Sequence, residues 1–206
     1  MHTVIVVSHP EPQSLSHSVA RQVGKGITLA DSGHTFEMVD LAAEGFDPRF
    51  TAADLAVHRM QATPAPDVLA EQARIAGADA LVLVYPVYWW SMPGQLKGWI
   101  DRVFSNGWAF DYRLDGTLIK KLRHLQVHLI GIGGANAPTY DRHGYAQAIK
   151  TQIDHGIFDY CGATVATSEL LLESETQDPA PHLATALAIG RSLFHREPCG
   201  QVPQAA

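Results

Sequence analysis

Three successive aromatic side chains, Tyr88, Trp89 and Trp90, are the most distinctive candidates for chemistry in this sequence. They follow an apolar run that ends in a proline, so they stand where a buried strand stops. Flat aromatic faces bind a flat heteroaromatic ligand, and backbone N–H groups of the same loop can meet its edge. We therefore assign Pro86, Val87, Tyr88 and Trp89 to a candidate ligand-binding loop. The alternative is that these rings fill the core or contact a second copy of the chain.

A second candidate loop carries hydroxyl groups and an imidazole ahead of a predicted helix. It contains His9, Ser14 and Ser16, and the helix is predicted to begin at about Leu15. The N–H groups and positive dipole at a helix N-terminus favour an anion, and serine hydroxyls add donors without bulk. The alternative is that a serine here is an ordinary helix cap. The loop has neither the GxGxxG pattern of dinucleotide-binding proteins nor a Walker motif.

Gly133 and Gly134 mark a third candidate loop, after an apolar strand predicted over 124–132. Glycines at the end of a strand allow a ligand to approach the backbone closely, although they also suit a flexible turn. Tyr140 and His143 follow and supply a phenol and an imidazole, which can act as proton donors. His143 is one of 11 histidines, so a surface position without a catalytic role is its alternative.

The predicted elements bring these three loops to one edge of a sheet. Strands are predicted over 2–8, 34–39, 79–85, 124–132 and 163–172, and helices over 15–29, 67–77, 93–104, 144–159 and 181–195. Strands that alternate with helices form a parallel sheet covered on both faces. Five such strands fit a flavodoxin-like three-layer sandwich with strand order 2-1-3-4-5, whose ligands bind beyond the carboxyl ends of the strands. We expect a single domain over 1–197 and a flexible tail over 198–206.

Composition excludes several classes of protein. The chain has 206 residues, 46% hydrophobic and 17% charged, with a net charge of −6, which argues against nucleic-acid binding. No apolar run is long enough for a membrane span and the start lacks a basic signal-peptide region, so we expect a cytoplasmic protein. Acidic residues do not cluster in the candidate loops, and no metal site is predicted. We expect Cys161 to be an inert core thiol, and Lys97 and Asp101 to form a surface pair.

Three segments together resemble the flavodoxin-like NAD(P)H:quinone oxidoreductase family. They are VIVVSHPEPQSLSHS at 4–18, DALVLVYPVYWWSMPGQLKGWIDRVFSNGWAF at 79–110, and GIGG at 131–134 with TYDRHGY at 139–145. The similarity is greatest to the branch of bacterial stress proteins and potassium-efflux ancillary proteins. The resemblance extends over about residues 3–172, and the long middle block is its most specific part.

The resemblance implies a flavin held by all three loops. The implied contacts are His9, Ser14, Leu15 and Ser16 at its phosphate; Pro86, Val87, Tyr88 and Trp89 at its ring system; and Gly133 and Gly134 at its edge. Tyr140 matches the family's tyrosine after the double glycine and would donate to a bound quinone. Family members place a histidine six residues further on, where this chain has Ala146, so neither His143 nor Tyr145 matches it directly.

The resemblance also implies a reaction. The cofactor would be FMN, with FAD as the alternative, and NADPH or NADH would be the electron donor. The implied chemistry is a ping-pong hydride transfer through the flavin that reduces a quinone-like acceptor by two electrons. A homodimer is implied. The alternatives are a flavin-binding regulatory subunit of a glutathione-gated potassium-efflux transporter in the membrane, a reductase of azo or nitro compounds, and an electron-transfer flavodoxin.

Overall fold

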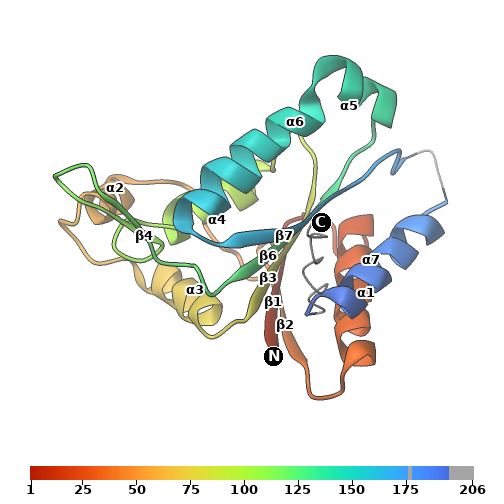
Figure 1. Cartoon of the computed structure of the whole chain (residues 1–206), viewed down its shortest axis with the longest axis horizontal. Helices are drawn as coiled ribbons and strands as arrows, with labels where there is room; N and C mark the ends of the chain where they lie inside the picture. The colour runs from red at the N-terminus through yellow and green to blue at the C-terminus, as the bar shows by residue number, and fades with distance from the viewer. Residues whose placement is uncertain (176–177, 195–206) are drawn as a thin grey trace, which may run out of the picture.

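The computed structural model describes residues 1–175 and 178–194, so the whole of the expected tail lies outside the described residues. Its central sheet is parallel, with the strand order β2-β1-β3-β6-β7 (Figure 1). The five strands are β1 (His2–Val7), β2 (Thr35–Asp40), β3 (Ala80–Pro86), β6 (Gln126–Ile132) and β7 (Thr164–Leu171). With the strands of a separate hairpin left out, this is the order 2-1-3-4-5. The predicted flavodoxin-like fold is therefore confirmed.

Helices cover both faces of the sheet (Figure 1). α1 (Leu15–Ala30) and α7 (Ala180–Ser192) lie on one face, and α3 (Pro66–Ala76) and α4 (Gly94–Val103) lie on the other. β3 is buried along its whole length because almost all of its side chains are apolar, which is typical of a central parallel strand. The two cores that result hold the strand ends, and the loops between strands and helices, in fixed positions.

The stretch after β6 differs from the prediction of one helix over 144–159. Asn136 starts a helix earlier, because its Oδ1 accepts the backbone N–H of Thr139 at 3.1 Å. Gly144 then adopts a φ of +68° and breaks the helix. The chain forms α5 (Ala137–His143), α6 (Tyr145–Ile149) and a π-helical segment, η1 (Lys150–Asp159). The loop after β6 is therefore shorter than expected, and Tyr140 and His143 lie on a helix.

Two further elements are short. One is the helix α2 (Ala52–His58), which lies between β2 and α3. The sequence does not predict the antiparallel hairpin of β4 (Phe110–Tyr112) and β5 (Leu118–Lys120), whose three-residue strands are too short to show an alternating pattern.

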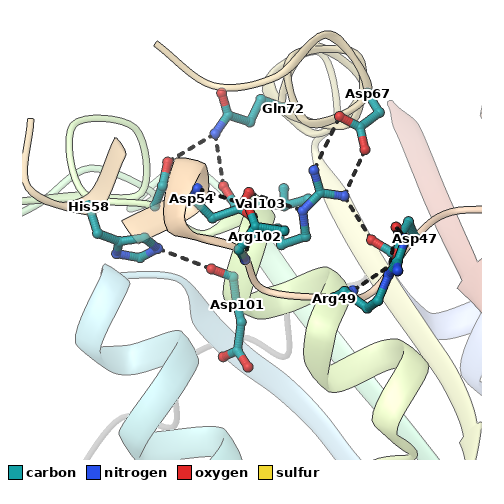
Figure 2. A network of polar contacts seen from close by, with 11 residues as sticks. Asp47, Arg49, Asp54, His58, Asp67, Gln72, Asp101, Arg102 and Val103 are labelled. Carbon is teal, nitrogen blue, oxygen red and sulfur yellow. Dashed lines mark hydrogen bonds and ion pairs between the residues drawn. The ribbon is translucent and has the colours of Figure 1, made fainter. Parts of the chain in front are cut away.

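Arg102 of α4 anchors the long segment between β2 and α3 (Figure 2). Its guanidinium donates to the Asp54 carboxylate at 3.0 Å, to the backbone carbonyl of Asp47 at 2.7 Å and to the Asp67 carboxylate at 2.7 Å. Arg102 and Asp54 are both buried. One side chain thus joins α2, α3 and α4.

Three smaller predictions can be compared with the structure. Lys97 Nζ lies 2.6 Å from Asp101 Oδ1 on the surface of α4, as predicted. Cys161 is buried, and burial raises the pKa of its thiol to about 12, so it is inert as predicted. Among the described residues, no helix combines the length and the apolar character that crossing a bilayer requires.

Candidate functional site

Three loops that follow neighbouring strands meet at the carboxyl edge of the sheet. They follow β1, β3 and β6, which lie side by side. Backbone hydrogen bonds hold them together. The N–H of Ser8, after β1, donates to the carbonyl of Val84 in β3 at 3.2 Å, and the N–H of Val87, after β3, donates to the carbonyl of Ile132 at the end of β6 at 2.8 Å. The structure thus brings together the three loops that the sequence singles out, at the edge where parallel sheets bind ligands.

The first loop ends at the N-terminus of α1, and Ser14 rather than Ser16 caps this helix. Ser14 Oγ accepts the backbone N–H of His17, while Ser16 is buried in the first turn. The N–H groups of Leu15 and Ser16 belong to this turn, where backbone donors have no carbonyl of their own helix to bond. The first turn carries no acidic side chain. The start of α1 is therefore suited to an anion.

A hydrogen-bonded brace of Ser14, His17 and Asp40 ties this loop to the end of β2. His17 Nδ1 lies 2.9 Å from Ser14 Oγ, and His17 Nε2 lies 2.8 Å from Asp40 Oδ2. In a serine-protease triad the ring nitrogens have the opposite partners, so we interpret this arrangement as structural. His9 meets the His17 ring edge-on, and its own Nδ1 accepts the N–H of Glu11 at 3.0 Å.

The Asp40 carboxylate orients this brace. It also accepts the backbone N–H groups of Ala42 and Ala43, both at 3.1 Å. Burial alone raises the pKa of Asp40, but the hydrogen bonds from His17, Ala43 and Ala42 outweigh burial and hold this pKa below its ordinary value. Asp40 is therefore charged at neutral pH and favours a hydrogen on Nε2 of His17, which leaves Nδ1 to accept the Ser14 hydroxyl.

The aromatic residues after β3 form a tight turn over Tyr88–Ser91. The N–H of Ser91 donates to Tyr88 at 3.1 Å, and the N–H of Tyr88 donates to Ser91 at 3.0 Å. The φ angles are +50° at Trp89 and +60° at Trp90. These are the features of a type I′ turn, whose central positions favour Asn and Gly because larger L-residues are strained there. The turn leaves the Trp89 side chain 94% exposed beside the third loop.

A small cavity of about 160 Å³ opens between the second and third loops. It is lined by Val87, Trp89, Trp90, Gly134, Ala135 and Tyr140. Predicted site residues from both loops, Val87 and Trp89 on one side and Gly134 and Tyr140 on the other, therefore face one space. The walls are aromatic rings, an aliphatic side chain and bare backbone, which suits the edge of a flat ring system.

Gly133 allows Tyr140 to lie close to the third loop. A Cβ at Gly133 would lie 2.7 Å from Tyr140 Oη, so a side chain has no room there. Tyr140 is buried, and burial raises the pKa of its phenol. The phenol thus stays protonated at neutral pH, as a donor must. Of the other predicted residues, Pro86 is the last residue of β3 and Tyr88 is 48% exposed.

Stacked rings join the aromatic turn to α5 and α6. The Trp90 ring stacks on Tyr145, with centroids 3.8 Å apart and planes within 11°, and meets Tyr140 edge-on at 5.4 Å. His143 is exposed and does not line the cavity; its ring stacks on Tyr145 at 5.2 Å. The structure therefore brings Tyr140 into the site and connects His143 to it through Tyr145.

His17, Trp90 and Tyr145 are residues of this site that the sequence analysis leaves unassigned. Trp90 stands in the aromatic run that the sequence singles out, but the conformation of the turn decides which of these rings faces the cavity and which faces solvent. His17 lies three residues after the helix cap, a spacing at which a side chain folds back over the cap. Tyr145 reaches Trp90 because Gly144 breaks the chain between α5 and α6, and the sequence analysis does not predict this break.

The residues of the three loops fit a flavin. A helix N-terminus without acidic neighbours in its first turn suits a phosphate group. The exposed indole of Trp89 offers a flat face, and Gly134 exposes backbone to a ring edge. Gly133, which the sequence also assigns to this edge, is buried, and its N–H donates to the Leu171 carbonyl at 2.9 Å. The structure thus supplies each kind of contact that the phosphate and the heteroaromatic ring of a flavin need.

Sequence comparison identifies relatives of this chain. A family model described as flavodoxin-like fold matches residues 1–190. A ribosyldihydronicotinamide dehydrogenase (quinone) from Pongo abelii is 30% identical over 194 residues, which cover 84% of this chain and 81% of the relative. The family match extends over all three loops of the site.

Structure comparison agrees with the sequence relatives. An NAD(P)H:quinone oxidoreductase from Methanothermobacter marburgensis superposes with a TM-score of 0.83 and 28% identity, over 96% of this chain and 98% of that one. General stress protein 14 from Treponema denticola, in complex with FMN, superposes with a TM-score of 0.66 and 24% identity, over 94% of this chain and 99% of that one. The second likeness concerns the fold alone. The resemblance to the NAD(P)H:quinone oxidoreductase family is confirmed.

Proposed function

This chain belongs to the flavodoxin-like family of NAD(P)H:quinone oxidoreductases and is an oxidoreductase, and from this premise we propose that it reduces quinones by two electrons with a bound flavin. The observation that carries the proposal is the aromatic turn. Trp89 is 94% exposed at a strained backbone position, next to a cavity bounded by Gly134 and Tyr140. A side chain held in this way is more easily explained by a flat ligand than by packing.

The residues of the chain would bind and orient rather than carry the hydride. A bound flavin supplies the hydride-transfer chemistry. The start of α1 would hold its phosphate, with Ser14 kept in place by His17 and Asp40. Tyr140 would donate a hydrogen bond to the acceptor's oxygen from a phenol that burial keeps protonated. We propose His143 as an outer residue that acts through Tyr145.

FMN is the proposed cofactor, with NADPH or NADH as the donor. The N-terminus of α1 is a site for one phosphate group, which is what FMN carries, whereas FAD carries a second phosphate and an adenosine. The donor and the quinone would use the same open face of the site in turn, which is a ping-pong sequence. The exposed Trp89 ring leaves room on that face for either molecule.

The proposal includes a homodimer in the cytoplasm. Trp89, Tyr112 and Leu114 expose large apolar side chains to solvent. Aromatic side chains are enriched at the centres of protein interfaces. Sedimentation of the purified chain tests this part, since a monomer at micromolar concentration would contradict it.

An absorbance spectrum of the purified protein is the first test, followed by heat release and chromatography of the chromophore. A released flavin with one phosphate supports FMN, and a released dinucleotide identifies FAD. Steady-state rates with NADPH or NADH and benzoquinone then test the order of steps, since ping-pong kinetics give parallel double-reciprocal lines. A colourless protein that does not bind added FMN would refute the proposal.

Catalysis by the isolated chain separates the enzyme from a regulatory subunit of a membrane transporter. An enzyme turns over NADPH or NADH and benzoquinone at several per second or more without a partner, as is usual for kcat. A protein that binds FMN but turns over far more slowly would favour the regulatory role. The same assay with azo and nitro compounds compares these acceptors with the quinone.

A further inference from the structure

A second hollow lies at the opposite edge of the sheet from the candidate flavin site. It has a volume of about 630 Å³ and is bounded by the amino-terminal parts of β6 and β7, the residues before β6 and the end of α7. None of the residues assigned to the flavin lines this hollow. Its chemistry is therefore independent of the proposed function.

The wall of this hollow is rich in hydrogen-bond donors and, among the described residues that line it, contains no carboxylate. The donors that matter here are Arg123, His124, Gln126, His128, Thr167 and Ser192. Arg123 carries a permanent positive charge, and the amide, hydroxyl and imidazole groups can all donate. A wall of this composition favours an anion over a cation or an apolar ligand.

His128 provides the independent sign of a ligand. Its side chain is only 2% exposed, and its Nδ1 lies 2.9 Å from Thr167 Oγ1. Its Nε2 is buried and has no hydrogen-bond partner. Burial lowers the pKa of His128 to about 4, so the ring is neutral at pH 7. A buried polar atom left unpaired is destabilising, so the unpaired Nε2 of a residue that lines the hollow calls for a partner.

A β-bulge places Thr167 opposite His128. Val127 pairs with Val165, but His128 pairs with Thr167, so β7 contains one extra residue, Ala166, at this point. Bulges at sheet edges redirect side chains and are typical of functional sites. Without the extra residue Ala166 would face His128, and the imidazole would lose its hydroxyl partner. The Thr167 hydroxyl can donate to Nδ1, which places the ring hydrogen on Nε2.

We propose that this hollow is a binding site for a small organic anion with a phosphate or carboxylate group. The Nε2–H of His128 would donate to the anion, with its tautomer held by Thr167. Arg123 would supply the charge at the rim, where it is exposed. The hollow is larger than one phosphate or carboxylate group, which leaves space for the organic part of the ligand.

Titration of the chain with inorganic phosphate and with acetate, in saturating FMN, tests this proposal. The FMN occupies the proposed phosphate site at α1, so that the probes cannot bind there. Ser14→Ala serves as the control, because it alters the α1 site and not the hollow. Calorimetry measures affinity, and NMR of ¹⁵N-histidine-labelled protein reports on Nε2 of His128. We expect saturable binding of one probe with a shift of the His128 Nε2 resonance. The tighter probe identifies the group that the ligand carries.

Variants of the wall decide whether the binding belongs to this hollow. His128→Phe should weaken the binding of the tighter probe at least tenfold, and Arg123→Ala should weaken it severalfold, whereas Ser14→Ala should leave it unchanged. If His128→Phe does not fold, Thr167→Val tests the same hydrogen bond and should also weaken binding. Absence of saturable binding of both probes, or binding that none of these wall variants alters, would overturn the proposal.

Discussion

At the scale of single residues, His17 fixes the shape of the first loop, which is the proposed phosphate site. It is buried and joins Ser14 to Asp40 through its two ring nitrogens. We expect His17→Leu to lower the free energy of unfolding by about 2 kcal/mol, because the Ser14 hydroxyl and the Asp40 carboxylate lose a buried partner. The loop would also lose its fixed shape, so the Kd for FMN should rise at least tenfold. Urea denaturation and a flavin fluorescence titration measure the two effects.

Ser18→Ala is the matched control for His17, since Ser18 lies in the same helical turn but outside the brace and donates to the Ser14 carbonyl at 3.2 Å. The pH dependence gives a second check. The pKa of Asp40 lies below its ordinary value, so its contribution to stability is present above about pH 4 and is lost as the pH falls through the folded-state pKa. The cost of His17→Leu should therefore shrink in acid. A cost that is equal at pH 7 and pH 3 would contradict this role.

Tyr145 is a positioning residue, because it touches the site through the Trp90 ring on which it stacks at 3.8 Å. We expect Tyr145→Ala to free the Trp90 ring, shift the tryptophan fluorescence to longer wavelength and raise KM for benzoquinone severalfold. Tyr145→Phe keeps the stacked ring and should behave like the native chain in both measurements. If Tyr145→Phe is as impaired as Tyr145→Ala, the hydroxyl matters and the stacking argument is wrong.

At the scale of elements, the turn over Tyr88–Ser91 holds two tryptophans where glycine is favoured. We expect Trp89→Gly to raise the free energy of unfolding of the flavin-free chain by about 1 kcal/mol, because glycine adopts the positive φ at this position without strain. FMN binding and quinone reduction should both weaken. Trp89→Ala also removes the ring but keeps the strained backbone, so it should weaken FMN binding without the gain in stability. Thermal denaturation of the two variants separates the effect of losing the Trp89 ring from the effect of relieving the backbone strain.

The elements also show what a sequence can predict here. Strands such as β1 and β3 are predictable because continuous β-branched and apolar residues specify a strand buried on both faces. Loops at the carboxyl ends of these strands are then placed by the sheet topology alone, which is why Trp89 and Gly134 are predicted into one site. α5, the π-helical form of η1 and the β4–β5 hairpin are not predicted, because such local features depend on tertiary packing more than on periodicity.

Contacts between distant side chains are the part of the site that the sequence does not predict. The brace depends on β2 bringing Asp40 next to β1, and on His17 turning its ring toward it. Tyr145 stacks on Trp90 because of a break at Gly144 and a turn after β3, which lie more than fifty residues apart. Each contact joins two segments that are far apart in the sequence, and the sequence pattern of one segment carries no information about the other.

At the scale of the whole molecule, Arg102 links the segment 41–65 to the helix that follows the aromatic turn. Its guanidinium donates hydrogen bonds to the carboxylates of Asp54 and Asp67 and to the Asp47 carbonyl (Figure 2). It also lies 5.1 Å from the centre of the Phe46 ring. α4 begins just after the turn that carries Trp89. Arg102 therefore connects the segment 41–65 and α3 to the helix that follows the aromatic loop. Loss of the Arg102 side chain should lower both the free energy of unfolding and the affinity for flavin.

We expect Arg102→Leu to lower the free energy of unfolding by about 3 kcal/mol at pH 7, because it leaves the buried Asp54 carboxylate without its cation. Burial raises the pKa of Asp54, but hydrogen bonds from Thr51 and Arg102 outweigh burial and keep this pKa below its ordinary value. The stability that Asp54 contributes is therefore present above about pH 4 and is lost as the pH falls further.

The difference in the free energy of unfolding between the native chain and Arg102→Leu should consequently become smaller as the pH is lowered, since protonation of Asp54 removes the unpaired charge from the variant. Urea denaturation at pH 7, 5 and 3.5 measures this. Arg49→Leu is the matched control, because Arg49 pairs with Asp47 at 2.6 Å on the same segment but is exposed, so its denaturation midpoint should stay close to the native value. An equal loss in both variants, or a loss for Arg102→Leu that does not depend on pH, would show that the segment is held by packing and not by the buried ion pair.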